Sequence, residues 1–318
     1  MARKRRGRQI DGWIVIDKQG GMTSTQVVGA VRRLLNAAKA GHAGTLDPLA
    51  TGVLPIALGR ATKTIPHLFG RPKLYWFRLR WGEARATDDA EGAVTETSDV
   101  RPGEASIRAA LPSFTGRIEQ VPPVYSAVKV AGARAYDLAR EGAPPKLEPR
   151  PVTVYRIELL SIPDRDHAEF RVECASGTYM RGLARDLARA LGTVGHVAAL
   201  RRLQVGPFAE AGAITLDKLK DLGHIPPPIT PVETVLDDIP ALAVTGDEAS
   251  RLRSGQSIAL LRRADLERLE GLKDGAEVCV MADGRALALA RRDGATVRPV
   301  RMLNSVQEGD DDVGYGRT

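Results

Sequence analysis

The sequence is poor in the residues that cross-link small folds or bind metal. It contains two cysteines, Cys174 and Cys279, which lie far apart in apolar runs with the character of strands. We therefore expect two buried free thiols and no disulfide scaffold. The five histidines show no metal-ligand spacing with each other or with cysteine, so the sequence indicates no metal site.

Long apolar runs and nucleotide-binding loops are missing as well. No apolar run reaches the length of a membrane span. The basic residues 1–8 are not followed by the apolar core of a signal peptide, and there is no Gly-x-x-x-x-Gly-Lys loop to cradle a phosphate. The sequence therefore predicts a cytoplasmic protein with no membrane segment and no cofactor motif.

What the sequence does have is positive charge on a chain long enough for a large core. It has 318 residues, 43% of them hydrophobic, which suffices for one large domain and a small one. Its net charge of +7 and pI of about 9.6 favour a polyanionic partner, with nucleic acid first among the candidates. A basic soluble protein without such a partner would show the same balance.

Residues 41–55 are the stretch best suited to chemistry. Their three glycines and two prolines exclude a regular helix or central strand through the first half. The only ionisable side chains are His42 and Asp47, and Asp47 precedes a proline, which favours extended or turn geometry. A rigid loop of small residues that presents one carboxylate suits catalysis. An ordinary Asp-Pro turn is the alternative interpretation.

Hydrophobic periodicity predicts a mixed α+β fold. We expect strands at residues 12–17, 53–58, 74–81, 152–160 and 168–174. We expect helices from a Thr or Ser cap at 23–25 to residue 39, at 106–111, and from 177 to 192. In the last helix Arg181, Arg185 and Arg189 line the side opposite the apolar face.

Composition divides the chain into four segments. We expect a flexible basic arm at 1–9, a large domain at 10–232, a small β-rich domain at 237–304 and an acidic disordered tail at 305–318. Three prolines after Ile225 mark the linker between the two domains. Residues 114–152, rich in proline and in basic side chains, are a candidate RNA-facing insertion. The basic arm either touches RNA phosphates or is a solvated tail.

Four segments, in order, resemble one protein family. Residues 41–55 are similar to the signature loop of the bacterial TruB-type tRNA pseudouridine-55 synthases. The other three motifs correspond to Asp17-Lys18 with residues 20–24, to residues 122–129 with Gly132, Arg134 and Tyr136, and to residues 177–181 followed by 200–203. One departure is Gln19, where the family usually has proline. It concerns the rigidity of this turn rather than the chemistry.

The resemblance implies a fold and an activity. The fold is a central, mixed, mostly antiparallel sheet with flanking helices and the active-site cleft across it, the pseudouridine synthase fold, followed by a PUA-like RNA-binding domain at 237–304. The activity is isomerisation of the T-loop uridine at position 55 of tRNA. It breaks the N1–C1′ bond, turns the base and joins C5 to C1′ without redox change, so we expect no cofactor. The implied partner is the tRNA T stem-loop, with no protein partner and a monomeric enzyme.

The resemblance also assigns catalytic roles to single residues. Asp47 corresponds to the essential carboxylate, which adds to the base, attacks C1′ or takes a sugar proton. Arg181 corresponds to the arginine that pairs with it, and we expect a planar two-bond pair that orients Asp47 and lowers its pKa. Tyr75 corresponds to the tyrosine that stacks on the uracil once the base has left the RNA stack.

Four further residues are implied to bind the substrate. Tyr179 and Leu200 line the uracil pocket, and His42 fills the gap left by the flipped nucleotide. Lys18 supports the loop or a phosphate. Without the resemblance, Tyr75 and Leu200 would be interpreted as core residues and His42 as an exposed loop residue.

Two other function classes fit the same sequence. A non-catalytic RNA-binding protein or RNA-folding helper would use the same basic surface and C-terminal domain. A hydrolase would use His42 and Asp47. Tritium release from 5-labelled uridine in tRNA separates the three, because only isomerisation frees the C5 hydrogen.

Overall fold

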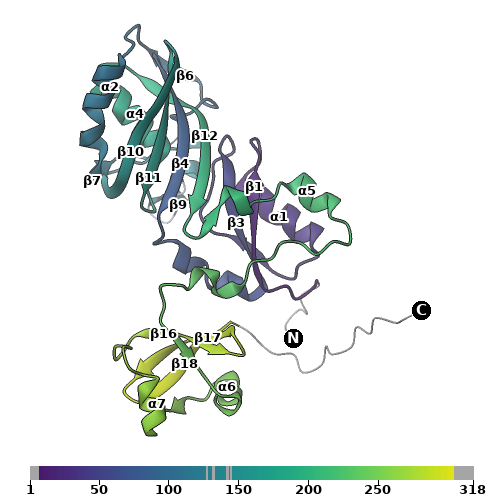
Figure 1. Cartoon of the computed structure of the whole chain (residues 1–318). Helices are drawn as coiled ribbons and strands as arrows, with labels where there is room; N and C mark the ends of the chain where they lie inside the picture. The colour runs from purple at the N-terminus through teal and green to yellow at the C-terminus, as the bar shows by residue number, and fades with distance from the viewer. Residues whose placement is uncertain (1–6, 127, 131–132, 141–142, 144, 304–318) are drawn as a thin grey trace.

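Two sheets divide the protein into a large part and a small part (Figure 1). The computed structural model describes residues 7–303 apart from 127, 131–132, 141–142 and 144. The acidic tail expected at 305–318 and residues 1–6 of the basic arm therefore lie outside the described residues. Figure 1 shows the small sheet below the large one, joined to it by a stretch of extended chain.

The large sheet is antiparallel at every pairing but one in the described part of the chain. Its strands run in the order β1-β3-β12-β4-β11-β10-β7, with β2 beside β3 and β13 beside β12. The parallel pairing joins β3 to β12. The nine strands are β1 (Gly12–Lys18), β2 (Ala40–His42), β3 (Thr51–Leu58), β4 (Lys73–Trp81), β7 (Gly116–Gln120), β10 (Arg150–Asp164), β11 (His167–Cys174), β12 (Gly195–Val205) and β13 (Phe208–Ala209). The mixed, mostly antiparallel sheet that we expected is confirmed.

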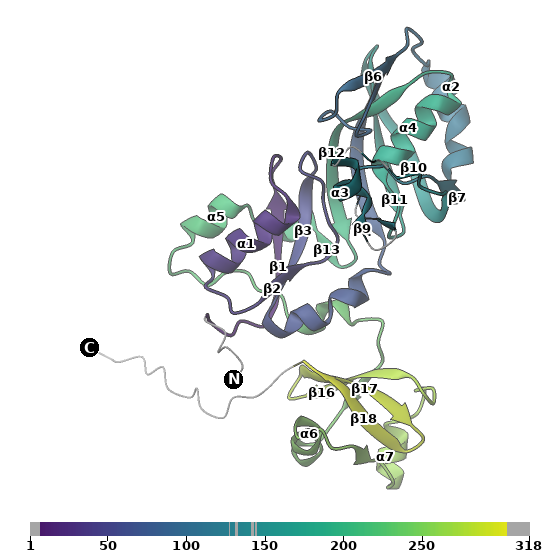
Figure 2. The same cartoon turned by 180° about the vertical axis from the view of Figure 1, so that it is seen from behind.

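Alternation along β4 decides which face of this sheet is covered. Alternate residues from Lys73 to Trp81 are buried, and the residues between them are half-buried, as the two-residue period of a strand requires. Figure 2 shows α1, α2 and α4 on this covered face, with α3 crossing in front of the sheet. The helices are α1 (Ser24–Leu34), α2 (Glu104–Ala110), α3 (Ala135–Arg140), α4 (Met180–Ala190) and α5 (Leu216–Asp221). The main hydrophobic core fills the space between these helices and the strands.

Helix α1 ends earlier than its sequence pattern predicts. Thr23 caps its start through a capping box with Gln26, within the range we expected. The helix stops at Leu34, well short of residue 39, because Asn36 adopts a left-handed conformation with φ of 47°. The Asn36 carbonyl accepts a hydrogen bond from the backbone of Arg8. Arg8, which we expected in a flexible arm, therefore contacts the chain just after α1.

Short elements connect the strands. The 3-10 helices are η1 (Gly59–Lys63), η2 (Ile65–Leu68), η3 (Leu111–Phe114), η4 (Glu210–Gly212) and η5 (Val232–Val235). Two small hairpins pair β5 (Glu83–Arg85) with β6 (Val94–Thr97) and β8 (Lys129–Val130) with β9 (Ala133–Arg134). The first hairpin carries the polar loop at 86–93, and the second lies in the segment 114–152 that we expect to face RNA.

The small C-terminal part is β-rich, as the glycine-punctuated apolar runs predicted. Its sheet has the order β14-β16-β17-β18-β15. Its elements are β14 (Ala241–Ala243), α6 (Gly246–Arg253), β15 (Ile258–Ala259), α7 (Arg263–Glu267), β16 (Glu277–Ala282), β17 (Arg285–Asp293) and β18 (Thr296–Met302). Between residues 7 and 303, no described helix is both long and apolar enough to span a bilayer.

Candidate active site

The loop between β2 and β3 carries Asp47 and is tied down by a buried arginine. Arg202 of β12 donates from Nε to the Val53 carbonyl at 2.8 Å and from Nη2 to the Gly44 carbonyl at 3.0 Å. Gly44 has a φ of +81°, and a side chain there would meet Arg202 Nη1 at 3.2 Å. Arg202 therefore fixes both the start of the loop and its entry into β3. The sequence shows Arg202 only as part of the segment 200–203 and gives no sign of these contacts.

Ser24 holds the residue that precedes Asp47. Its hydroxyl accepts a hydrogen bond from Leu46 N at 2.8 Å and donates one to Leu46 O at 3.0 Å. The serine is buried at the start of α1, where Thr23 does the capping, so its hydroxyl is free for this contact. Both backbone polar groups of Leu46 are satisfied by one side chain. The helix start and the Asp47 loop are thus locked together.

Lys18 fastens the loop after Asp47. Its ammonium donates to the carbonyls of Pro48 at 3.0 Å and Ala50 at 2.6 Å. The residue is 1% exposed, and burial lowers the pKa of this lysine to about 8. These contacts favour the loop-supporting role among the two that we predicted for Lys18. A contact of Lys18 with a phosphate stays a prediction.

The carboxylate of Asp47 faces the guanidinium of Arg181. Asp47 Oδ2 lies 2.9 Å from Arg181 Nε, and the two side chains are 34% and 5% exposed. The other two nitrogens donate to the carbonyls of Thr87 at 2.8 Å and Tyr125 at 2.9 Å. Three separate segments therefore position one guanidinium. A substrate can reach Asp47, whereas Arg181 lies behind it.

The geometry of this pair differs from the expected one, and its effect on the pKa of Asp47 has the expected direction but is outweighed by burial. The contact uses a single guanidinium nitrogen rather than a planar two-bond arrangement, because the Thr87 and Tyr125 carbonyls occupy the other two nitrogens. Burial raises the pKa of the Asp47 carboxyl, the Arg181 guanidinium opposes that shift, and the Asp89 carboxylate adds to it. The net direction is upward because desolvation outweighs the pair. A third of the side chain still meets solvent, which limits the size of the shift.

Acidic residues of the loop between β5 and β6 complete the charge arrangement, and sequence reasoning missed them. Asp89 is buried, with Oδ2 3.6 Å from Arg181 Nη1, and Asp88 Oδ2 lies 2.9 Å from Arg185 Nη1. Its polar composition alone is typical of a surface loop. The signal was present, because two adjacent acids match two arginines spaced by one turn of α4.

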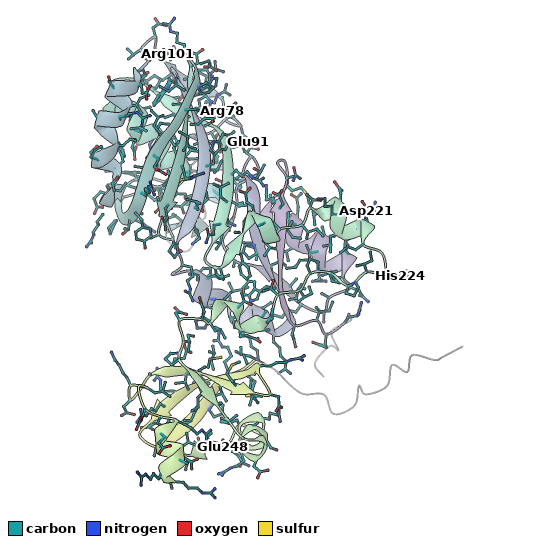
Figure 3. All side chains as sticks on the ribbon, in the orientation of Figure 1. Arg78, Glu91, Arg101, Asp221, His224 and Glu248 are labelled. Atoms are coloured by element: carbon teal, nitrogen blue, oxygen red, sulfur yellow. The ribbon has the colours of Figure 1, made fainter. Side chains whose placement is uncertain are left out.

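Glu91 extends the acidic side of the site. Figure 3 labels it beside β12, on the loop between β5 and β6. Burial raises the pKa of the Glu91 carboxyl, and the carboxylates of Asp89 and Asp47 add to the shift. Glu91 therefore lies within the electrostatic field of Asp47.

The aromatic residues assigned to the uracil lie around the same carboxylate. Tyr75 and Tyr179 both have a raised pKa, caused first by burial and increased by the charge of Asp47. Tyr75 is 8% exposed and faces the covered side of β4. The backbone N–H of Tyr179 donates a hydrogen bond to Gln120 Oε1 at 2.8 Å, which positions this residue. Both hydroxyls therefore stay protonated at neutral pH.

Leu200 and His42 lie on either side of the loop. The Leu200 carbonyl accepts a hydrogen bond from the Thr51 hydroxyl at 3.3 Å, where the loop enters β3. His42 ends β2, and burial, followed by the charge of Arg202, lowers the pKa of its imidazole. A neutral ring suits the gap-filling role predicted for His42, since no charge has to be placed inside the RNA stack. The structure thus gathers all the predicted site residues around the loop.

One neighbouring cavity lies outside this arrangement. This cavity of about 400 Å³ at the start of β4 is lined by Arg71, Lys73, Gln204 and Asp237 among others. Among the described residues, no group of three or more His, Cys, Asp or Glu side chains is placed to hold a metal ion.

The chain is similar to known proteins along most of its length. The profile described as TruB family pseudouridylate synthase (N terminal domain) matches residues 32–180, and the profile described as tRNA pseudouridylate synthase B C-terminal domain matches residues 181–237. A protein named tRNA pseudouridine synthase B from Gluconacetobacter diazotrophicus is 58% identical over 307 residues, which cover 95% of this chain and 100% of that protein. A protein of the same name from Rhodospirillum rubrum is 51% identical, over 96% of this chain and 100% of that protein.

A solved structure supports the fold as well. The structure of an H/ACA RNP bound to a substrate RNA containing 2′-deoxyuridine superposes with a TM-score of 0.69 at 26% identity, and covers 96% of this chain and 92% of that chain. The two matching profiles meet inside α4 and end before the small β-rich part begins. That part is therefore described by its structure and not by a matching profile.

Proposed function

The chain belongs to the TruB family of pseudouridylate synthases, and from this we propose that it isomerises the T-loop uridine at position 55 of tRNA to pseudouridine. The observation that carries the proposal is the accessible carboxylate of Asp47, paired with a buried arginine on a loop held by three side chains. Isomerisation needs such a carboxylate beside the sugar and the base.

The proposed division of labour follows from burial and charge. Asp47 acts on the nucleotide, by adding to the base, attacking C1′ or taking a sugar proton. Arg181 keeps the carboxylate aimed and ionised, which matters because burial favours the neutral form. Tyr75 stacks on the flipped uracil, which offsets about 1–3 kcal/mol of the cost of leaving the RNA stack. Tyr179 and Leu200 line the pocket, and His42 fills the vacated space.

The proposal includes partners and surroundings. We propose the T stem-loop of tRNA as the substrate, with the insertion at 114–152 and a PUA-like domain at 237–304 facing the RNA. The net charge of +7 supports an RNA partner. We further propose a monomeric cytoplasmic enzyme that needs no cofactor or protein partner, which light scattering and activity of metal-free protein would test.

Tritium release tests the function directly. The substrate is tRNA transcript labelled at C5 of uridine, and we expect release of one tritium per tRNA. A transcript in which cytidine replaces uridine 55 should release none from that position. An RNA-binding protein or RNA-folding helper would bind the transcript without release, and a hydrolase would cut it without release. Either result would reject the proposed function.

A further inference from the structure

Two buried cations lie on the floor of the site without a carboxylate partner. Lys73 and Tyr75 alternate onto the same face of β4, and Arg202 of β12 lies directly opposite Tyr75 in the register. Lys73 is 8% exposed and Arg202 is 1% exposed. Lys73 donates to the hydroxyl of Ser176 and to a backbone carbonyl, and Arg202 donates to two backbone carbonyls. Among the described residues neither forms an ion pair.

The two arginines of α4 near the site, in contrast, have carboxylate partners. Arg181 has Asp47 and Asp89 within 4 Å, and Arg185 has Asp88. A buried charge without a counter-ion is costly. Burial, followed by the neighbouring charge of Arg202, lowers the pKa of Lys73 to about 8. The positive charges of Lys73 and Arg202 are therefore not compensated by carboxylates, whereas those of Arg181 and Arg185 are.

The position of these cations relates them to the nucleotide. A Cβ at Gly44 would lie 3.2 Å from Arg202 Nη1 and 3.7 Å from Lys73 Cε. The loop that carries Asp47 thus passes directly over both cations. Tyr75, the proposed uracil-stacking residue, is next to Lys73 on the same face of β4 and lies opposite Arg202 in the register. Negative charge brought in by the target nucleotide would arrive beside this pair.

We propose that Lys73 and Arg202 form an anion-binding floor that receives an anionic oxygen of the target nucleotide. This inference rests on the proposed function. Two sources share the chemistry. One is a phosphate of the flipped nucleotide. The other is the uracil itself: when the N1–C1′ bond breaks, its electron pair stays on N1, and the base carries one negative charge, delocalised onto O2 and O4. That charge is consumed when C5 bonds to C1′, and the proton lost from C5 is balanced by protonation of N1.

Lys73 is the better residue to change, because Arg202 also ties the Asp47 loop. We compare Lys73→Met and Lys73→Arg with the parent, using a T stem-loop RNA and single-turnover kinetics. We expect Lys73→Met to lose about tenfold or more in affinity or in rate, because a contact between a charged donor and an anion is removed. Ser176→Ala removes the hydroxyl partner of Lys73 but leaves its charge, so it should stay within threefold of the parent.

The pH dependence gives a readout that a structural role would not move. Lys73 must be charged to attract an anion. The affinity or the single-turnover rate of the parent should therefore fall as the pH rises through about 8. Lys73→Arg keeps its charge, so its affinity and rate should stay constant over this range. Lys73→Met should show the reduced affinity or rate at every pH. The groups facing Lys73 are Arg202 on β12 and Cys174 on β11, and burial raises the pKa of that thiol to about 11. Lys18 also has a pKa of about 8, but a loss caused by Lys18 would persist in Lys73→Arg.

An RNA with an abasic target nucleotide separates the two sources. If the anion is a phosphate, Lys73→Met weakens both the uridine and the abasic RNA, and the slope of log affinity against log salt falls by about 0.7. If the anion is the uracil, affinity for both RNAs is unchanged and the rate falls tenfold or more. Parent-like affinity, rate and pH profile in Lys73→Met would reject the proposed anion-binding floor. Losses of affinity or rate in Ser176→Ala equal to those in Lys73→Met would reject it as well. Absence of tritium release by the parent would instead reject the function.

Discussion

Asp47 is held in a place that does not favour its charge. Burial raises the pKa of its carboxyl despite the guanidinium 2.9 Å away. Arg181 contacts the carboxylate through one nitrogen only, because its other two nitrogens donate to backbone carbonyls. The pair is therefore better suited to aiming a reactive carboxylate than to stabilising the fold. Two predictions at the residue scale follow from this arrangement.

Replacement of Asp47 should separate activity from stability. We expect Asp47→Asn to lose about 10³-fold or more in single-turnover rate, because an amide is neither nucleophile nor base. A carboxyl with a raised folded-state pKa binds its proton more tightly when folded, so the parent loses stability as the pH rises through that folded pKa. The amide variant lacks this loss. Its melting temperature should therefore equal or exceed that of the parent at pH 7, and the difference should shrink in acid. Activity within tenfold of the parent would reject Asp47 as the essential group.

Arg181→Lys should be severe although it keeps the charge. A lysine offers one point donor and cannot contact Asp47, the Thr87 carbonyl and the Tyr125 carbonyl together. Misplacing the carboxylate by about 1 Å costs on the order of 10²-fold in rate. The matched control is Arg189→Lys, on the exposed side of the same helix. Parent-like single-turnover rates for both variants would leave Asp47 without its proposed partner.

At the scale of elements, the Asp47 loop has one turn hydrogen bond of its own, from Ala50 N to Asp47 O at 3.1 Å, and is otherwise positioned by its neighbours. Its carbonyls and amides are bound by side chains of β1, α1 and β12. A loop without internal ladder hydrogen bonds is rigid only where other groups satisfy its backbone. Each of these side chains therefore contributes to catalysis by fixing geometry.

Ser24 and Thr23 make a matched pair that tests this positioning. Ser24→Ala leaves both polar groups of Leu46 without their partner, which should cost about 1–3 kcal/mol of stability and lower the single-turnover rate. Thr23→Ala removes the cap of the same helix, at a cost of about 1 kcal/mol, but does not touch the loop. We expect a rate loss in the first variant only. Chemical denaturation and single-turnover kinetics measure the two effects, and equal rates in both variants would count against positioning by Ser24.

The sequence predicted this site unevenly, for reasons of distance along the chain. Asp47 could be predicted because its own neighbours, two prolines and three glycines, mark a rigid loop, and because family motifs resemble it. The partners of Ser24 and Arg202 lie 22 and 149 residues away, so no local pattern shows them. The prediction of a two-bond pair between Arg181 and Asp47 was wrong for the same reason, because Thr87 and Tyr125 come from segments distant in the sequence. The strands were predictable because alternation is local, whereas the end of α1 is set by the left-handed conformation of Asn36, which the apolar period does not show.

At the scale of the whole molecule, a second apolar cluster joins the two sheets. Leu289 and Leu303 of the small part pack in one cluster with Val235 of η5 and with Trp13 and Val53 of the large part. Val53 lies where the Asp47 loop enters β3. The small β-rich part is therefore not an independent appendage, because its contacts reach the layer beneath the loop.

Removal of the small part should thus have two effects that can be told apart. We expect a chain ending at residue 240 to bind tRNA at least tenfold more weakly, because it lacks the proposed PUA-like domain, while its rate at saturating RNA stays within a few-fold of the parent. It should also lose stability, because Val235 and Leu236 become exposed where Leu289 and Leu303 covered them. Full-length Arg71→Gln provides the comparison, since it breaks the ion pairs of Arg71 with Asp237 and Asp238 in the linker and keeps the small part. Urea titration establishes the temperature at which the truncated chain is folded, and single-turnover kinetics are then measured there. A collapsed rate in a folded truncated chain would mean that the small part contributes to chemistry through the shared apolar cluster, and the division between RNA binding and catalysis would be wrong.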